Sequence, residues 1–326
     1  MTPSPRIPIR ARDAPGGAVA GGADHEAPCL IKGCAEMDVY TFLIQVLNGL
    51  QYGLLLFLVA SGLTMIFGIM GIINLAHGSF YMIGAYLAWA FAAATGSLFS
   101  AILLGLVVST LIGVILEWTV FRRLYHRDHL YQVLLTFGLI MIFEELRSMT
   151  FGDDVHSVAI PAVFSAAIPL TDTLSYPVYR LVISATCLVV AMLIYWLIQH
   201  TRLGMMIRAG ASNREMVQVL GIDIKLVYTL VFALGLALAA FAGMIAAPIS
   251  TVYPNMGGQI LIISFVVVVV GGIGSVKGTL LAALMIGMAD TFGKIVLPQI
   301  ASMSAYLLMA AVLLWRPRGL FAVGGR

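Results

Sequence analysis

Long apolar blocks separated by short polar segments fill the chain from about residue 37 onward. Several of these blocks reach the roughly 20 residues that a helix needs to cross a lipid bilayer. Nine follow one another, at about residues 41–73, 80–94, 98–120, 130–149, 179–198, 226–251, 260–271, 279–296 and 300–315. The short alternating segments that typify outer-membrane barrels do not occur. The pattern predicts an all-α, polytopic bundle of about nine transmembrane helices, or eight to ten depending on whether the first block divides.

The first block, residues 41–73, carries a polar face that lipid would penalise. Polar side chains recur at i, i+3 and i+6 in its first half, at Gln45, Asn48 and Gln51. This face is expected to lie against another helix or an aqueous path. Glycines weaken a helix, so we expect its second half to be breakable at Gly62, Gly68 and Gly71.

A polar interruption follows the first block, with Asn74, His77 and Ser79 between two apolar stretches. Irregular backbone at membrane depth is tolerated only where protein buries it or where it lines a cavity. His77 is either a hydrogen-bonded packing residue or a contact for a solute, and the sequence leaves both open.

The longest charged segment between two apolar blocks is residues 201–225. Within it, Ser212 and Glu215 have the spacing of a capping box, in which each side chain bonds the other residue's backbone N–H. A narrow apolar stripe follows at helical spacing, formed by Met216, Val219 and Leu220. Gly221 is placed to end this helix in the left-handed conformation. A helix of about two turns is marginal alone, so we expect it to dock on the rest of the chain or on a partner.

Basic residues mark one side of the predicted bundle. Eleven Lys and Arg lie in the segments 121–130, 200–225, 272–278 and 316–326. The other side has at most Arg147, Arg180 and Lys294. By the positive-inside rule the first side is cytoplasmic. Residues 201–225 and the C-terminus are therefore expected inside, and the loop 150–176 outside.

Composition supports a membrane protein and sets the first residues apart. Hydrophobic residues make up 61% of the chain and charged residues 10%, with a mean hydropathy of +1.01, whereas soluble domains are about 25% charged. Residues 1–36 are rich in Pro, Ala and Gly and contain no apolar run. We interpret them as disordered or as an over-extended start, with Met37 as an alternative initiator, and residues 37–326 as the membrane domain. The net charge of +3 does not indicate a nucleic-acid partner.

The chain shows no catalytic, cofactor-binding or metal-ligating motif. Residues 272–279 are rich in glycine, but their Lys277 precedes Gly278, whereas a phosphate loop needs Gly-Lys-Ser/Thr in that order. Asp290 and Lys294 are spaced i, i+4, and a structural ion pair is favoured over a proton relay. Acidic residues near the predicted membrane faces, Glu117, Glu144 and Glu145, are interpreted as locally paired or snorkelling.

Five stretches together resemble the LivH-type permeases of bacterial branched-chain amino acid ABC importers. They are Gln45-x-x-Asn48-Gly49-Leu50, Gly71-Ile-Ile-Asn74-Leu-Ala-His77-Gly78, Thr201-Arg-Leu-Gly204 through Arg208-Ala209 to Leu220-Gly221-Ile222, Gly271-Gly272-Ile-Gly274-Ser275, and Arg316-Pro317-x-Gly319-Leu320. The likeness covers residues 37–326. The resemblance implies a multi-pass protein of the bacterial inner membrane.

The resemblance also implies partners. They are a second, related permease subunit, two ATPase subunits that use the ATP, and a periplasmic solute-binding protein. Residues 212–221 look like the cytoplasmic coupling helix that sits in a cleft of an ATPase subunit. The residues expected to serve this coupling are Gly204, Arg208, Ser212, Glu215, Met216, Leu220 and Gly221. This chain itself is then no enzyme and needs no cofactor.

The solute is the least determined feature. Branched-chain or other hydrophobic amino acids are expected first, and urea or short amides second. The path of the solute is expected to pass three polar residues that lie within otherwise apolar, membrane-spanning sequence, Asn48, Asn74 and His77. A stand-alone carrier or channel remains an alternative, although it would leave the cytoplasmic helix without a role. An intramembrane enzyme would lack a nucleophile and a base.

Overall fold

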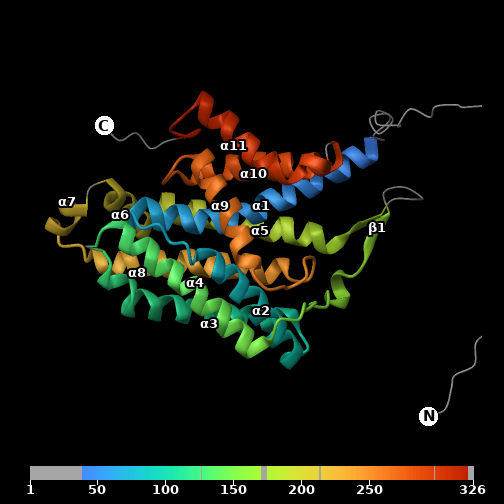
Figure 1. The fold of residues 1–326 in the computed structure, drawn as a ribbon, viewed down its shortest axis with the longest axis horizontal. Helices are drawn as coiled ribbons and strands as arrows, with labels where there is room; N and C mark the ends of the chain where they lie inside the picture. Colours follow the sequence, from blue (N-terminus) through green and yellow to red (C-terminus); the bar gives the residue numbers. More distant parts are fainter. Residues whose placement is uncertain (1–38, 126, 170–174, 213, 297, 322–326) are drawn as a thin grey trace, which may run out of the picture. The chain divides into compact units, whose positions relative to one another are not determined.

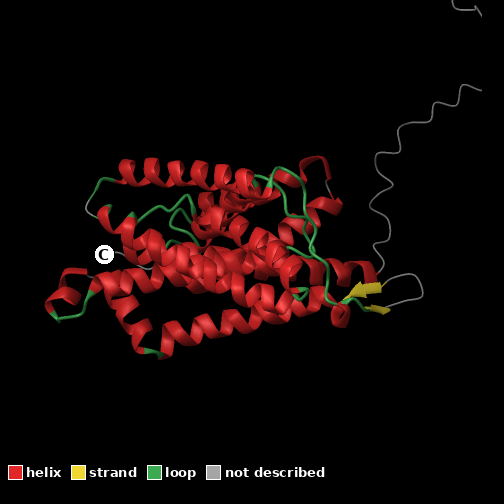
Figure 2. Ribbon diagram, turned by 90° about the horizontal axis from the view of Figure 1, so that it is seen from below, coloured by secondary structure: helices red, strands yellow, loops and turns green. Residues whose placement is uncertain are grey.

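The fold is helical almost throughout (Figures 1 and 2). A computed structural model describes residues 39–125, 127–169, 175–212, 214–296 and 298–321, without the side chains of residues 212, 214, 215, 300 and 302. The predicted all-α class is confirmed for these residues. The tail 1–36, expected to be disordered or over-extended, lies outside them.

The helices coincide with the predicted apolar blocks and add a pair in the charged segment. They are α1 Val39–Met70, α2 His77–Thr95, α3 Leu98–Thr119, α4 His129–Phe151, α5 Val178–His200, α6 Arg202–Ser212, α7 Arg214–Val219, α8 Ile224–Ala246, α9 Met256–Gly271, α10 Val276–Val296 and α11 Ser304–Trp315. Short 3-10 turns lie at Phe121–Arg123, Ala162–Phe164 and Pro298–Met303. The loop between α4 and α5 forms a small antiparallel hairpin, in which β1 Ala167–Pro169 pairs with β2 Ser175–Pro177.

Five helical stretches in the described part of the chain are long and apolar enough to cross a membrane. They are Val39–Met70, Leu98–Arg123, Val178–His200, Ile224–Ala246 and Val276–Val296. Two shorter apolar helices are α9 and α11. The chain is thus a multi-pass membrane protein, while nine crossings stay a prediction.

The helix α1 forms the centre of the bundle and is continuous for 32 residues. The expected break was therefore wrong at Gly62 and Gly68, whereas the helix does end before Gly71, which has φ +67°. Every residue from Gly53 to Ile66 is buried, because α8 and α10 pack closely on either side. Gly62 serves this packing: a Cβ there would lie 2.5 Å from the carbonyl oxygen of Gly235 on α8. Small residues let membrane helices approach closely, and here they join helices rather than end one.

Two irregular segments, residues 71–76 and 247–255, lead into helices that begin inside the bundle. Nε2 of His77, the first residue of α2, lies 2.9 Å from the carbonyl oxygen of Val59. Val59 precedes the end of α1 by eleven residues, which is about 16 Å at 1.5 Å per residue. α9 begins beside the same place, since a Cβ on Gly257 would lie 2.7 Å from the carbonyl oxygen of Gly78. The predicted span 226–251 therefore ends early, at Ala246, and α9 starts before the expected residue 260.

The basic segments gather at one end of the bundle. The ring of Phe121 packs on that of Phe232 near the start of α8, with centroids 4.5 Å apart. Lys277 lies over the ring of Tyr195 near the end of α5. The final residues join the turn between α9 and α10, where the Leu320 N–H donates to the Val270 carbonyl at 2.9 Å. In Figure 1, α6 and α7 lie at this end and the β1 hairpin lies at the opposite end.

Candidate functional site

The charged segment folds into two helices rather than one. The short helix expected within residues 212–221 is α7, and α6 is an additional helix that begins after Thr201. Oγ1 of Thr201 accepts from the Gly204 N–H at 3.1 Å and donates to the Leu197 carbonyl at 2.5 Å. Arg208 donates from its guanidinium to the carbonyl of Ile198. α6 is thereby fixed to the end of α5.

Gly204 is buried where α6 meets the end of α5, whereas Arg208 is exposed. A Cβ on Gly204 would lie 2.5 Å from the Leu197 carbonyl oxygen, so no larger residue fits at this corner. Both residues thus help to position α6 on α5, and their part in coupling to an ATPase stays a prediction.

The helix α7 presents the predicted apolar stripe outward. Met216 is 57% exposed, Val219 82% and Leu220 70%. Val217, on the opposite face, is 3% exposed and joins the core. Gly221 has φ +79° and follows the helix end, as predicted. The side chains of Ser212 and Glu215 lie outside the described part, so the capping box stays a prediction.

The three residues expected along a solute path lie in two places. Asn48 lies near the outer end of α1, eleven residues before Val59, and therefore about 16 Å from it along the helix. Its Oδ1 accepts from Arg180 Nη1 at 2.7 Å and from the Tyr176 hydroxyl at 3.2 Å. The polar face of α1 thus meets α5 and the hairpin at Asn48, as expected of a face that avoids lipid.

Arg180 is a residue that the sequence analysis missed. Its only described partner is Asn48, with no carboxylate among the described residues, whereas Arg147 and Lys294 are ion-paired. The signal was present in the sequence as a lone arginine at the start of an apolar block, on the side that is otherwise poor in basic residues.

Asn74 and His77 lie together at the start of α2. Both are fully buried. The carbonyl of Asn74 accepts from the His77 N–H at 3.3 Å. Neither atom of the Asn74 amide has a hydrogen-bond partner in the described part of the chain, and Nδ1 of His77 has none either. Because a carbonyl only accepts, Nε2 of His77 donates to Val59, and Nδ1 of the neutral ring is an acceptor.

Asp290 and Glu144 are locally ion-paired, as their positions suggested, whereas the interpretation of Glu145 stays a prediction. Asp290 and Lys294 form an ion pair at 2.6 Å. Arg147 bonds Asp153 at 2.9 Å and Glu144 at 3.3 Å. The hydrogen bond from Arg147 lowers the pKa of Asp153 in the loop between α4 and α5.

Glu117 is fully buried without a described cation, contrary to a snorkelling residue. It accepts from the Tyr125 hydroxyl, and from Thr229 Oγ1 at 2.6 Å. These bonds tie α3 to the first turns of α8. No group of three potential metal ligands occurs over the described ranges.

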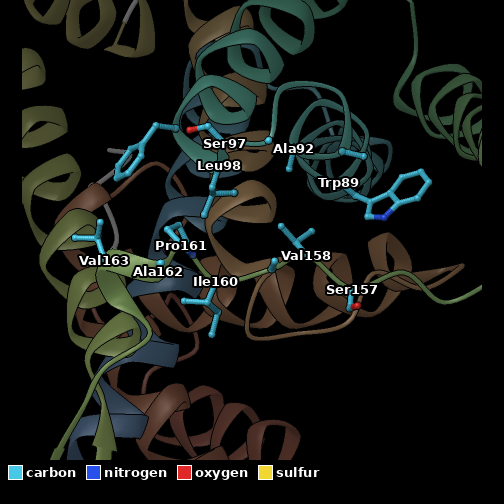
Figure 3. A pocket seen from close by; sticks show the side chains of 14 residues that line it. Trp89, Ala92, Ser97, Leu98, Ser157, Val158, Ile160, Pro161, Ala162 and Val163 are labelled. Carbon is cyan, nitrogen blue, oxygen red and sulfur yellow. The ribbon is translucent and has the colours of Figure 1, made fainter.

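A cavity of about 540 Å³ lies at the opposite end from the basic segments (Figure 3). The end of α2, the start of α3 and residues 157–163 line it. His156 stacks on Trp89 at its edge, with centroids 3.8 Å apart, and shares two backbone hydrogen bonds with Val252. No charged side chain lines the cavity, so it offers no counter-charge to an ionised solute.

Comparison with known proteins agrees with this architecture. A family model described as branched-chain amino acid transport system / permease component matches residues 45–315. The high-affinity branched-chain amino acid transport system permease protein BraD of Pseudomonas aeruginosa is 30% identical over 298 residues, which cover 87% of this chain and 96% of BraD. The corresponding LivH protein of Escherichia coli is 29% identical over 301 residues, 88% of this chain and 97% of LivH.

One solved structure is more distant. PsaBC from Streptococcus pneumoniae, in complex with Fab, is 13% identical, with a TM-score of 0.46 over 82% of this chain and 89% of that chain. The family model and the relatives, in contrast, extend over nearly the whole described bundle. The chain therefore belongs to the family of branched-chain amino acid transport system permease components.

Proposed function

We propose that this chain is a membrane-spanning subunit of an ATP-driven importer that carries branched-chain or other hydrophobic amino acids. A periplasmic binding protein would deliver the solute to the end that holds the hairpin. A second, related permease would complete the path, and two ATPase subunits would hydrolyse ATP outside this chain. The basic end, with residues 201–225 and the C-terminus, would face the cytoplasm of a bacterium.

The exposed stripe on α7 carries this proposal. Val219 and Leu220 present apolar surface at the basic end, beyond the bundle that the other helices form. A six-residue helix does not persist alone in water, and Val217 supplies its only deep anchor in the described core. An ATPase cleft would bury the stripe. Movement of the ATPases would then reach the bundle through α6, which Arg208 and Thr201 fix to α5.

Two alternatives make different demands. An importer of urea or short amides would use the same partners and differ only in the solute. A stand-alone carrier would need an ionisable relay through the bundle, and Asp290 is already neutralised by Lys294 at 2.6 Å. The carrier would also leave the stripe of α7 exposed to water.

Uptake into vesicles tests the proposal. The vesicles hold this chain, its companion permease and the ATPases, with the binding protein outside and ATP inside. We expect labelled leucine to enter only when both ATP and the binding protein are present. Uptake of labelled urea alone would keep the importer and replace the solute. Leucine uptake by this chain alone, driven by a proton gradient, would contradict the importer.

A further inference from the structure

We propose that the place where α2 and α9 begin, together with Asn74 and His77, receives the carboxylate and ammonium groups of the transported amino acid. We call this place the α2/α9 junction. The proposal rests on the proposed function and names the part of the path that would recognise the solute.

Two helix N-termini meet at the α2/α9 junction. Ala76 occupies the N-cap of α2 and has no side chain that could bond, while Asn255 at the N-cap of α9 makes no capping bond. Uncapped N-termini present backbone N–H groups and the positive end of the helix dipole, which together bind anions. A carboxylate is an anion of this kind.

Two backbone donors remain at the point of contact. The N–H groups of His77, Ser79 and Gly258 bond carbonyls of the preceding turns. The N–H groups of Gly78 and Gly257 make no such bond among the described residues. These two glycines are the pair whose backbones touch, and the Leu261 side chain packs beside Gly78.

The side chains beside the N-termini supply a second, independent observation. Asn74 and His77 are both 0% exposed, and the Asn74 amide and Nδ1 of His77 lack any described partner. Buried polar atoms are nearly always bonded, so each exception needs an explanation. The amide oxygen and Nδ1 can accept from an ammonium group, and the amide N–H₂ can donate to a carboxylate.

The α2/α9 junction therefore matches both charges of an amino acid without a charged side chain. This is an advantage inside a membrane, where an unpaired ionised residue is costly. The competing features are unsuitable. Lys294 is neutralised by Asp290, Arg180 lies at the outer end and bonds Asn48, and none of the described unpartnered buried polar atoms lines the 540 Å³ cavity.

The burial of the α2/α9 junction fits a step of an alternating-access cycle. In this conformation the backbones of Gly78 and Gly257 touch, and Asn74 and His77 beside them are fully buried. A solute would enter when α2 and α9 separate, as the paired broken helices of transporters do around a central site.

The test compares stability with transport in the complete importer. Asn74→Leu replaces an unpartnered amide by an apolar group of similar size. We expect the melting temperature of the purified complex to hold or rise, because the buried unpaired groups disappear. We also expect leucine moved per ATP hydrolysed to fall at least tenfold. His77→Phe is the second variant, with the same expected fall. Ser61→Ala is the control, since Ser61 is buried but bonds the Leu58 carbonyl of its own helix, and it should transport as the unaltered chain does.

Each result of this test either supports or overturns the proposed site. Leucine uptake at the unaltered rate in both Asn74→Leu and His77→Phe would overturn the proposal. A melting temperature that falls together with uptake would also overturn it, because the amide would then serve the fold, for example through a buried water. If the unaltered complex itself fails to carry leucine, the proposed function fails, and that result is separate from the behaviour of the variants.

Discussion

Gly257 and Gly78 touch where α9 and α2 begin, and a Cβ on Gly257 would lie 2.7 Å from the carbonyl oxygen of Gly78. Real side chains do not approach backbone so closely, so only glycine allows the two helices to meet here. Gly78 follows the irregular segment 71–76, and Gly257 follows the irregular segment 247–255. The contact therefore brings together the starts of two helices that lie far apart in the sequence.

Gly257→Ala should destabilise the bundle. The added methyl group must push α9 away from α2, and overpacking of this kind costs about 1–3 kcal/mol. Thermal unfolding of the purified chain in detergent measures the effect. Gly138→Ala on α4 is the matched control, because a Cβ there meets nothing within 4 Å. An unchanged melting temperature for Gly257→Ala would show that the two helices meet differently.

Thr229→Val should loosen the start of α8. Thr229 donates at 2.6 Å to Oε2 of the fully buried Glu117, and leaving a buried acceptor without its partner costs about 1–3 kcal/mol. Because α8 directly follows α7, the proposed coupling helix, we also expect less leucine to move per ATP. Thermal unfolding and coupled uptake measure the two effects.

Thr110→Val on α3 is the control for Thr229→Val. The Thr110 hydroxyl bonds only the Leu106 carbonyl of its own helix, at 2.6 Å. A change within about 0.5 kcal/mol is expected for such a site. Equal losses of unfolding free energy in Thr229→Val and Thr110→Val would mean that the bond to Glu117 stabilises the fold no more than a hydroxyl bond within one helix does.

Arg180→Met and Asn48→Leu should each lower stability, and their losses should not be additive in the double variant. Both remove the same 2.7 Å hydrogen bond between α5 and α1, so the double variant should lose little more than the larger single loss, about 1.5–3 kcal/mol. Gln45→Leu serves as the control, because its bond to Asn48 is long at 3.4 Å. Fully additive losses in a double-mutant cycle would show that Arg180 and Asn48 contribute to stability independently, and would contradict this prediction.

The sequence predicted the helices well, because apolar length determines which segments can span a membrane. The sequence analysis failed at glycines, because a glycine can either break a helix or let a neighbouring helix approach closely. Gly62 was expected to permit a break in α1, but it lets α8 approach instead. Likewise, the sequence analysis did not predict the helix that contains Gly204, although Thr201, three residues earlier, is a residue type that caps helix N-termini well. Whether a glycine ends a helix or admits a neighbour depends on tertiary contacts that a single sequence does not contain.

The candidate site was predicted in part. Asn74 and His77 were identified as polar residues in apolar surroundings, and the structure brings them together at the start of α2. Asn48 was grouped with them on the same ground, yet it bonds Arg180 near the outer end of α1. Polarity identifies which residues avoid lipid, but the partner that satisfies each one is set by packing between distant segments.

Val217 and Val219 allow the coupling proposal to be separated from the fold. They are the same residue on one short helix, but Val217 is 3% exposed and Val219 is 82% exposed. Val219→Asp should change the free energy of unfolding by no more than about 0.5 kcal/mol, and it should abolish co-purification with the ATPase subunits because the cleft would have to bury a charge. Val217→Asp should cost about 3 kcal/mol, since the buried carboxylate has no described cation nearby.

Comparing the loss of ATPase binding with the loss of stability in these two variants decides whether α7 docks by its outward face. Co-purification and thermal unfolding are measured for both variants, with Gln218→Asp as the control for an added charge at an exposed position that lies off the stripe. We expect Gln218→Asp to keep both assembly and stability. If Val219→Asp still binds the ATPases, the stripe packs elsewhere and the coupling proposal is wrong. If instead Val219→Asp unfolds as readily as Val217→Asp, the exposed face of α7 contributes to the bundle itself, and the docking surface must be sought on α6, where Met205 is 57% exposed.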